Sequence, residues 1–260
     1  DIPTITTVHG HDITKHENAQ LENSVNRRFF DEVDQVIAVS DFIAGQALAK
    51  GCPENKLVQH YIGIDLEKFS QPKQESERPS LLFVGRLVEK KGCSYLLQAM
   101  SQLKQRFPEL QLTIIGSGDL EPQLRQEVEQ RQLKVIFAGT ASAAEIREQL
   151  ARSWLFVAPS ITAQNGDAEG LGMVFLEAQA LQTPVVSFRS GGLVEAVEED
   201  VTALLSDEKD VTGLADNIAC LLENSDQRHH MGRAGRERVE QRFDLRKQCA
   251  KLESIYAKLR

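Results

Sequence analysis

Residues 80–116 read SLLFVGRLVEKKGCSYLLQAMSQLKQRFPELQLTIIG. In this stretch a short apolar run that ends in glycine is followed by a helical pattern and then by a second apolar run of the same kind. Strand, helix and strand in this order predict a βαβ unit with parallel strands. The residues that keep the spacing of one buried helix face are Cys93, Leu96, Leu97, Met100 and Leu103.

The same alternation continues toward the C-terminus. Further strand patterns are LKVIFAG, LFVAPS and PVVSF, and each is preceded by a helical pattern: LEPQLRQEVEQRQ, SAAEIREQLARS and GMVFLEAQALQ, in this order. From about residue 209 the pattern is helical, and it ends in an amphipathic helix, DLRKQCAKLESIYAKL. Because right-handed crossovers join such units, we expect an α/β fold with a doubly wound parallel sheet.

A polar segment, QPKQESERP at residues 71–79, has the composition of a linker. Before it, DIPTITTVHG, VIAVS and LVQHYIG are strand patterns, and DFIAGQALAKG is a helical one. We therefore expect residues 1–70 to be the C-terminal part of a preceding domain, 80–240 a ligand-binding domain, and 241–260 a C-terminal helix. Since the chain opens within a strand pattern, we expect it to be a piece of a longer protein.

The composition excludes several classes of protein. Of the 260 residues, 41% are hydrophobic and 26% charged, as in a globular protein. The net charge is −8 and the basic residues are dispersed, so no nucleic-acid partner is expected. The apolar runs are far shorter than the roughly 18 residues of a membrane span. Four widely spaced cysteines without a CxxC pair indicate neither a zinc site nor a disulfide framework, and favour a cytoplasmic compartment.

Four turns that follow predicted strands carry unusual residues: VGRLVEKKG, IGSGDLEP, QNGDAEGLG and RSGGLVEAV. Ligands of α/β sheets bind at the carboxyl ends of the strands. Arg86 and Lys91, together with glycine-rich helix N-termini, predict a site for a diphosphate. The alternative for each turn taken alone is that the cations are solvated and the glycines only form the turn.

Other sites are less well supported. The stretch GSGDLEP has Glu121 where the dinucleotide motif GxGxxG needs a third glycine, and the chain has no GxxxxGK[ST] loop. A nicotinamide enzyme and an ATPase are therefore disfavoured. His11, His16 and His60 lack partners at metal-ligand spacing, so no metal site is predicted.

Taken together and in order, the motifs resemble a retaining GT-B glycosyltransferase of family 4. They are HGHD, VIAVS, YIGIDLEKF, GRLVEKKGCSYLLQAM, the GxG of IGSG, VAPS, the Ex7E pair Glu169 and Glu177, and PVVSFRSGGLVEAV. TAQNGDAEGLGMVFLEAQA is closest to members that build bacterial exopolysaccharides such as colanic acid. The resemblance covers essentially the whole chain. Family members have a full N-terminal domain, most of which we expect to be missing here.

The resemblance implies roles for individual residues. Arg86 and Lys91 would bind the pyrophosphate of the donor and stabilise it as it leaves. Glu169 would face the donor sugar, Glu177 would accept hydrogen bonds from the ribose, and His9 would project toward the transferred sugar. The backbone around the rest of the donor would be that of Gly116, Gly118, Phe137, Ala138, Gly139, Gly170, Leu171, Gly172 and Met173.

The two acids of the Ex7E pair suit opposite ends of one ligand. If a helix begins near Leu171, Glu177 lies about two turns inside it, roughly 9 Å along the axis. The alternative for Glu177 is a solvated helix face. Glu195 matches a family acid near the phosphate-binding turn, but a structural role is equally open. For QNGDA, residues 164–168, we expect a part in choosing the sugar.

The resemblance also implies an activity. Residues 80–240 would bind a nucleotide-sugar donor, UDP-glucose or UDP-galactose, and a hexose would pass with retention to a glycan or lipid-linked glycan in exopolysaccharide biosynthesis. No cofactor or metal is expected. A nucleotide-sugar epimerase or hydrolase, and a catalytically idle nucleotide-sugar-binding module, are the alternatives. Peripheral association with the inner face of the plasma membrane would involve the missing N-terminal domain.

Overall fold

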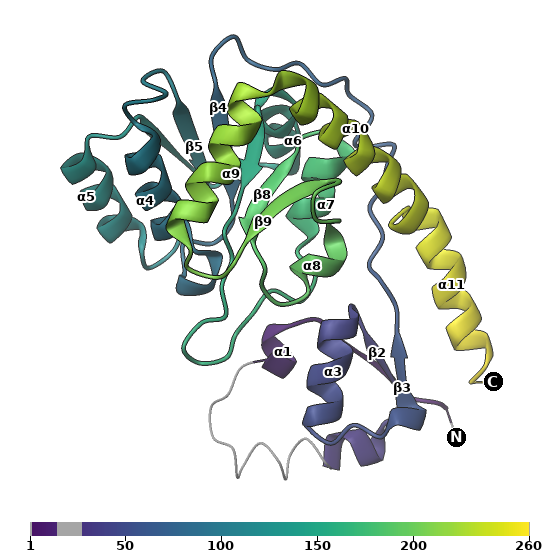
Figure 1. The fold of residues 1–260 in the computed structure, drawn as a ribbon. Helices are drawn as coiled ribbons and strands as arrows, with labels where there is room; N and C mark the ends of the chain where they lie inside the picture. The colour runs from purple at the N-terminus through teal and green to yellow at the C-terminus, as the bar shows by residue number, and fades with distance from the viewer. Residues whose placement is uncertain (1, 15–27, 260) are drawn as a thin grey trace.

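The computed structural model describes residues 2–14 and 28–259, which form two α/β units. In Figure 1 the larger unit lies above and the smaller one below, and the C-terminal helix runs from the first down the side of the second. Each unit is built on its own parallel sheet. The prediction of an α/β fold with a doubly wound sheet is confirmed.

The larger sheet has six parallel strands in the order β6-β5-β4-β7-β8-β9. Their bounds are β4 Ser80–Val84, β5 Gln111–Ile115, β6 Val135–Gly139, β7 Leu155–Val157, β8 Val185–Phe188 and β9 Ala203–Ser206. The chain adds strands outward from β4 on one side and then returns to add β7 on the other. The crevice between β4 and β7, where the direction of winding reverses, is the place where such sheets bind ligands.

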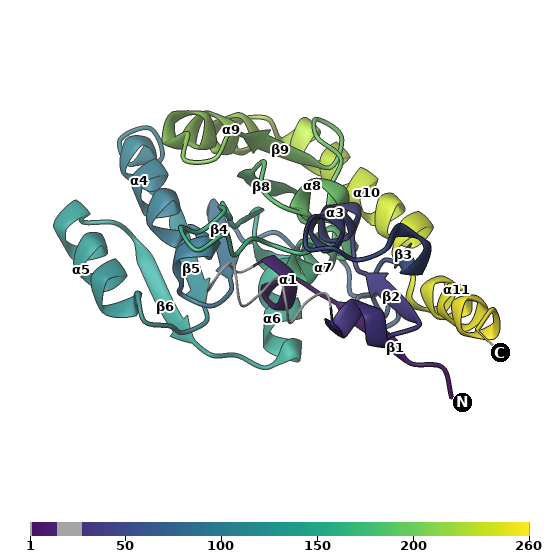
Figure 2. The ribbon, with the colours of Figure 1, turned by 90° about the horizontal axis from the view of Figure 1, so that it is seen from below.

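Helices cover both faces of this sheet (Figure 2). On one face α4 packs against α5 and α9, and on the other α7 packs against α6, α8 and α10. The five apolar residues predicted for the buried face of α4 are all buried. The bounds are α4 Cys93–Leu103, α5 Glu121–Arg131, α6 Ala143–Arg152, α7 Met173–Ala180, α8 Leu193–Ala196, α9 Val211–Glu223 and α10 Ser225–Arg242, with a 3-10 turn, η2, at Glu89–Lys91.

The smaller unit has a three-stranded parallel sheet in the order β1-β2-β3. Its elements are β1 Ile5–Val8, α1 His11–Thr14, β2 Gln35–Ala38, α3 Asp41–Ala49, a 3-10 turn η1 Glu54–Lys56, and β3 Leu57–Gln59. The last helix, α11 Leu245–Ala257, returns to this unit. The chain passes between the two units twice, near Ile64 and near residues 243–245, and the two passing segments are hydrogen bonded to each other. Ile64 N–H donates to the Phe243 carbonyl at 2.7 Å, and Leu245 N–H donates to the Ile64 carbonyl at 3.0 Å.

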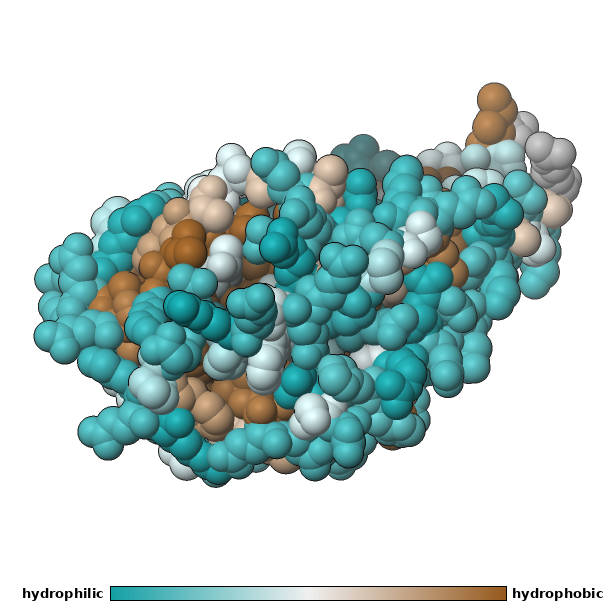
Figure 3. Space-filling model, turned by 90° about the horizontal axis from the view of Figure 1, so that it is seen from above, coloured by the Kyte–Doolittle hydropathy of each residue, from teal (hydrophilic) through white to brown (hydrophobic). Residues whose placement is uncertain are grey.

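The structure differs from the sequence expectation at one strand. β9, with the sequence ALLS, was not predicted, although all four of its residues are buried beside β8. The helical pattern predicted from about residue 209 is confirmed by α9, α10 and α11. In the described part of the chain, no helix is long and apolar enough to cross a membrane. The surface seen from above is mainly hydrophilic, and hydrophobic side chains show in its hollows (Figure 3).

Candidate functional site

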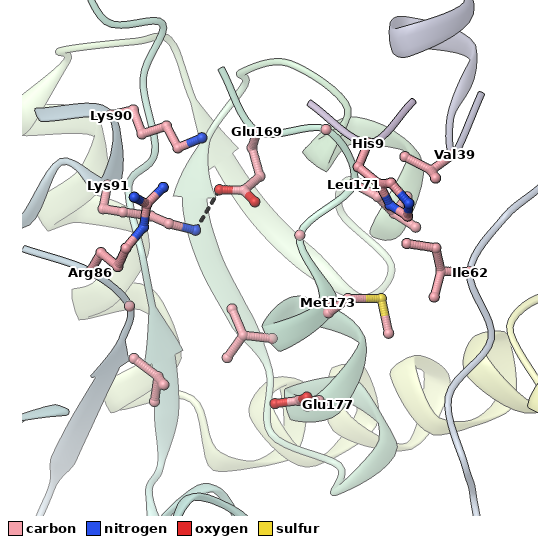
Figure 4. A pocket seen from close by; sticks show the side chains of 15 residues that line it. His9, Val39, Ile62, Arg86, Lys90, Lys91, Glu169, Leu171, Met173 and Glu177 are labelled. Carbon is pink, nitrogen blue, oxygen red and sulfur yellow. Dashed lines mark hydrogen bonds and ion pairs between the residues drawn. The ribbon is translucent and has the colours of Figure 1, made fainter. Parts of the chain in front are cut away.

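A cavity of about 460 Å³ lies at the crevice between β4 and β7, where the smaller unit faces the larger one. The turns after β4 and β7 and the first turns of α7 form most of its wall, and residues of the smaller unit close the opposite side (Figure 4). The lining residues are His9, Val39, Ile62, Val84, Gly85, Arg86, Lys90, Lys91, Glu169, Gly170, Leu171, Gly172, Met173, Val174 and Glu177.

Two cations predicted to bind a diphosphate lie together on one side of this cavity (Figure 4). The Nζ of Lys91 is 2.5 Å from Oε2 of Glu169, and the two side chains are only 14% and 13% exposed. Arg86 is exposed and forms no ion pair with another described residue. One cation is therefore neutralised by an acid of the site, whereas the other is available to an anion.

A third cation in the cavity wall, Lys90, was not predicted. Its Nζ is 2.8 Å from Oδ1 of Asp167, with both side chains buried. Asp167 also accepts hydrogen bonds from Thr14 and from Nδ1 of His11, each at 3.3 Å. Burial alone would raise the pKa of Asp167, but Lys90 and then His11 lower it below 3.8. The polar stretch QNGDA thus places an ionised acid that joins the turn before Glu169 to the smaller unit.

The turn around Glu169 is shaped by close contact with the smaller unit. A Cβ added at Gly170 would lie 1.8 Å from the His9 carbonyl oxygen, so only glycine fits there. Gly172 has φ +82°, which a side chain would strain, and it forms the N-cap of α7. The glycines bring His9 and Glu169 to the same cavity, and Figure 4 shows His9 opposite the two cations.

Glu177 lies lower in the cavity, on α7 (Figure 4). The expected helix start was wrong by two residues, because the positive φ of Gly172 ends the turn and α7 begins at Met173. Glu177 is therefore about one turn inside the helix, not two. Burial raises the pKa of Glu177 above 4.5, although Arg147 acts in the opposite direction. Its carboxylate has no hydrogen-bond partner among the described residues, and the half-buried side chain lines the cavity rather than the outer surface of the molecule.

The predicted backbone groups at 116–118 and 137–139 are not part of the cavity wall. A Cβ at Gly116 would lie 1.9 Å from the Gly85 carbonyl oxygen, and one at Gly118 2.5 Å from that of Leu87. These glycines therefore let their turn pack against the turn that carries Arg86. Phe137 is covered by the guanidinium of Arg125, 4.3 Å from the ring centroid. Ala138 and Gly139 lie beside it on the edge strand β6.

Glu195 points away from the cavity and toward the smaller unit. Its carboxylate accepts hydrogen bonds from the backbone of Asp41 and Phe42 and from the hydroxyl of Tyr61. This arrangement agrees with the structural interpretation of Glu195 and gives it a contact that the sequence did not predict. Across residues 2–14 and 28–259, acids, histidines and cysteines do not gather into a group of three that could hold a metal. His16 lies outside the described residues.

Two α/β units with a cavity between them are the arrangement of GT-B glycosyltransferases, and solved structures of such enzymes superpose on this chain. The HepE protein of Anabaena, solved with UDP and glucose, superposes with a TM-score of 0.82 at 21% identity, over 98% of this chain and 71% of HepE. Sucrose-phosphate synthase from Thermosynechococcus elongatus superposes with a TM-score of 0.81 at 24% identity, over 98% of this chain and 67% of that one.

The chain belongs to the glycosyl transferases group 1, whose family model matches residues 65–238. Residues 1–68 match the Glycosyltransferase Family 4 model. AmsK of Erwinia amylovora, an amylovoran biosynthesis glycosyltransferase, and WcaL of Escherichia coli, named for colanic acid biosynthesis, are each 32% identical over 92% of this chain. The chain spans 60% of the length of either relative. A GDP-mannose-dependent mannosyltransferase of Mycobacterium tuberculosis is 31% identical over 95% of this chain and 68% of its own length.

Proposed function

We propose that the cavity binds the diphosphate and sugar of a nucleotide sugar and that the chain is the donor side of a hexosyltransferase. The observation that supports this proposal most directly is the order in which the charged groups line the cavity. Arg86 and Lys91 lie at one level, Glu169 faces them, and Glu177 lies one helical turn below Met173 (Figure 4). This order matches a ligand with a diphosphate between a sugar and a ribose.

The proposed mechanism relies on electrostatics. In glycosyl transfer, negative charge accumulates on the departing phosphate while the sugar acquires oxocarbenium character. Arg86, Lys91 and the N-terminus of α7 are placed to stabilise that charge, a preorganised contribution that is usually the largest single one. Glu169 would position the sugar, with His9 on the other side. Because cations and a helix end supply the positive charge, the proposal needs no metal.

Glu177 is proposed to accept hydrogen bonds from the ribose. It is a half-buried carboxylate that faces the cavity, and partial burial without a donor is costly for such a group. Two ribose hydroxyls would supply the missing donors. Residues 80–240 would then be the donor domain, 1–70 part of the acceptor domain, 71–79 the linker and 241–260 the closing helix.

We base the proposed donor, acceptor and stereochemistry of transfer on the relatives of this chain and on the family that it resembles. UDP is the first candidate for the nucleotide part of the donor, because HepE was solved with UDP and glucose. GDP-mannose is the second, because the mycobacterial relative is named for it. Transfer with retention to a glycan or lipid-linked glycan, in exopolysaccharide biosynthesis at the inner face of the plasma membrane, is the activity that we propose for the whole protein.

A thermal-shift screen tests the proposal. UDP, GDP, ADP, CDP and their hexose conjugates are added to the chain, with inorganic phosphate as the control. A ligand at 100 times its dissociation constant adds about 2.7 kcal/mol of stability, which is readily detected. At least one nucleoside diphosphate should raise the melting temperature far above phosphate alone, and failure of every one would reject the proposal. Product analysis with labelled donor then separates transfer from epimerisation, hydrolysis and binding without turnover.

A further inference from the structure

The carboxylate of Glu195 joins the two units. Asp41 N–H donates to it at 2.7 Å, Phe42 N–H at 2.8 Å and the Tyr61 hydroxyl at 3.1 Å. All three donors belong to the smaller unit, whereas Glu195 lies on α8 of the larger one. The two backbone donors are in the first turn of the nine-residue helix α3, where unpaired N–H groups and the helix dipole favour a negative charge.

The N-terminus of α3 is also hydrogen bonded to the turn at Gly170, which lines the cavity. Ser40, the N-cap of α3, is completely buried, and its hydroxyl accepts from Ile43 N–H. This hydroxyl donates to the carbonyl of Gly170 at 2.6 Å. Since Gly170 directly follows Glu169, the N-terminus of α3 is fixed between Glu195 and the turn that carries the sugar-facing acid.

The segment that carries Glu195 is itself hydrogen bonded to the backbone of the turn that lines the cavity. Gly192 N–H, three residues before Glu195, donates to the Glu169 carbonyl at 2.8 Å. A Cβ at Gly192 would lie 1.9 Å from the Gly170 carbonyl oxygen, so this contact also requires glycine. The other neighbour of Gly170 is the His9 backbone. Glu195, α3, His9 and the turn at Glu169 thus form one continuous set of contacts.

We propose that Glu195 is a positioning residue, which holds the first turn of α3 and thereby keeps His9 at the sugar end of the cavity. This inference rests on the proposed function and deepens it. The groups proposed for UDP, which are Arg86, Lys91 and Glu177, all belong to the larger unit, whereas the sugar end is closed by the smaller one. Loss of Glu195 should therefore weaken binding of the sugar portion and spare UDP.

The test compares Glu195→Gln with a matched control, Glu198→Gln. Glu198 lies in the same segment, but its partner Arg238 belongs to the larger unit, at 2.9 Å. Affinities for UDP and UDP-glucose are measured by calorimetry, or for GDP and GDP-mannose if the screen selects guanosine. Glu195→Gln should bind the nucleotide sugar about 5- to 20-fold more weakly while UDP affinity changes less than about twofold. Glu198→Gln should change neither, and Tyr61→Phe should show a smaller loss of the same kind.

Equal losses for both ligands would overturn the positioning role, because they would mean that Glu195 only stabilises the chain. Unchanged affinities would overturn it as well. A second measurement needs no nucleotide: spin labels are placed at the exposed positions Leu48→Cys and Val201→Cys, one on each unit, after Cys220 and Cys249 are replaced by serine. The unsubstituted chain should give one narrow distance distribution and Glu195→Gln a broad one.

The two measurements distinguish the two proposals. A chain that binds no nucleotide rejects the proposed function, and the distance distribution then still decides whether Glu195 holds the units together. A distribution that stays narrow in Glu195→Gln rejects the positioning role even if UDP binds as expected.

Discussion

The Nζ of Lys91 lies 2.5 Å from Oε2 of Glu169. This ion pair joins the cation proposed for the diphosphate to the acid proposed for the sugar, and both side chains are largely buried. A charge-assisted hydrogen bond of this kind is strong. The carboxylate of Glu169 must therefore compete with the phosphate oxygens of a donor for the same ammonium group.

Glu169→Gln should release Lys91 to the diphosphate. We expect UDP to bind this variant at least as tightly as the unsubstituted chain, and up to about fivefold more tightly, since one hydrogen bond of Lys91 is redirected to the ligand. Calorimetric titration of UDP measures the change. Glu89→Gln is the control and should have little effect, because this exposed acid of the turn that carries Lys91 does not line the cavity and its carboxylate accepts a hydrogen bond from Gln164 N–H. Weaker UDP binding in Glu169→Gln would show that the acid supports the diphosphate rather than competing with it.

Glu177 should make UDP binding depend on pH. Burial raises the pKa of Glu177, so this group takes up a proton at a higher pH than an exposed glutamate does. Only the ionised form accepts two hydrogen bonds from a ribose. UDP affinity should therefore exceed that of Glu177→Gln by about 5- to 20-fold where Glu177 is ionised, and the two affinities should converge as the pH falls through the raised pKa of Glu177. A ratio that stays constant with pH would argue against the ribose contact.

Gly170→Ala should disturb the contact between the units. The added Cβ would lie 1.8 Å from the His9 carbonyl oxygen, so backbone must move. We expect a loss of about 1–3 kcal/mol in the free energy of unfolding, measured by urea denaturation. Gly45→Ala is the matched control, because a Cβ at this helical position meets nothing within 4 Å and should stabilise the chain by about 0.5–1 kcal/mol. Equal behaviour of the two variants would contradict the close packing at Gly170.

Lys73 should give the chain a stability that rises with pH. Burial lowers the pKa of Lys73 to about 7, while Glu75 opposes the shift, and the amine bonds Thr183 Oγ1 at 2.8 Å and the carbonyls of Leu150 and Ser153. The unfolded chain therefore binds more protons than the folded one between about pH 7 and 10. From pH 7 to 9 the free energy of unfolding should rise by about 2 kcal/mol more than in Lys73→Met. Parallel pH profiles would refute this.

Most of the larger unit could be predicted from sequence because its strands and helices have strong local patterns. Buried strands such as β4 are continuous apolar runs, and α4 has a clear stripe of buried residues. β9 was missed because ALLS contains no β-branched or aromatic residue, and it becomes a strand through pairing with β8. The start of α7 was misplaced because the left-handed conformation of Gly172 is set by the turn around it.

Only those residues of the site that directly follow a strand or lie at the start of a helix could be predicted from the sequence. The rule that ligands bind at the carboxyl ends of strands brought Arg86, Lys91 and Glu169 together. The pairs that join the units, Asp167 with Thr14 and Glu195 with α3, connect residues more than 150 apart in the chain. Their partners depend on how two independently patterned units dock, which no local sequence spacing records.

The proposed diphosphate site is tested most directly by one calorimetric titration, of UDP into Arg86→Ala. Arg86 is the cleanest position because it is exposed and has no ion-pair partner among the described residues, so its removal leaves no buried charge unpaired. Arg78→Ala, which removes an exposed arginine paired to Glu109, is the control. We predict UDP binding about 10- to 100-fold weaker in Arg86→Ala and unchanged in Arg78→Ala. An unchanged UDP affinity in Arg86→Ala would contradict the assignment of this cavity to a nucleotide sugar.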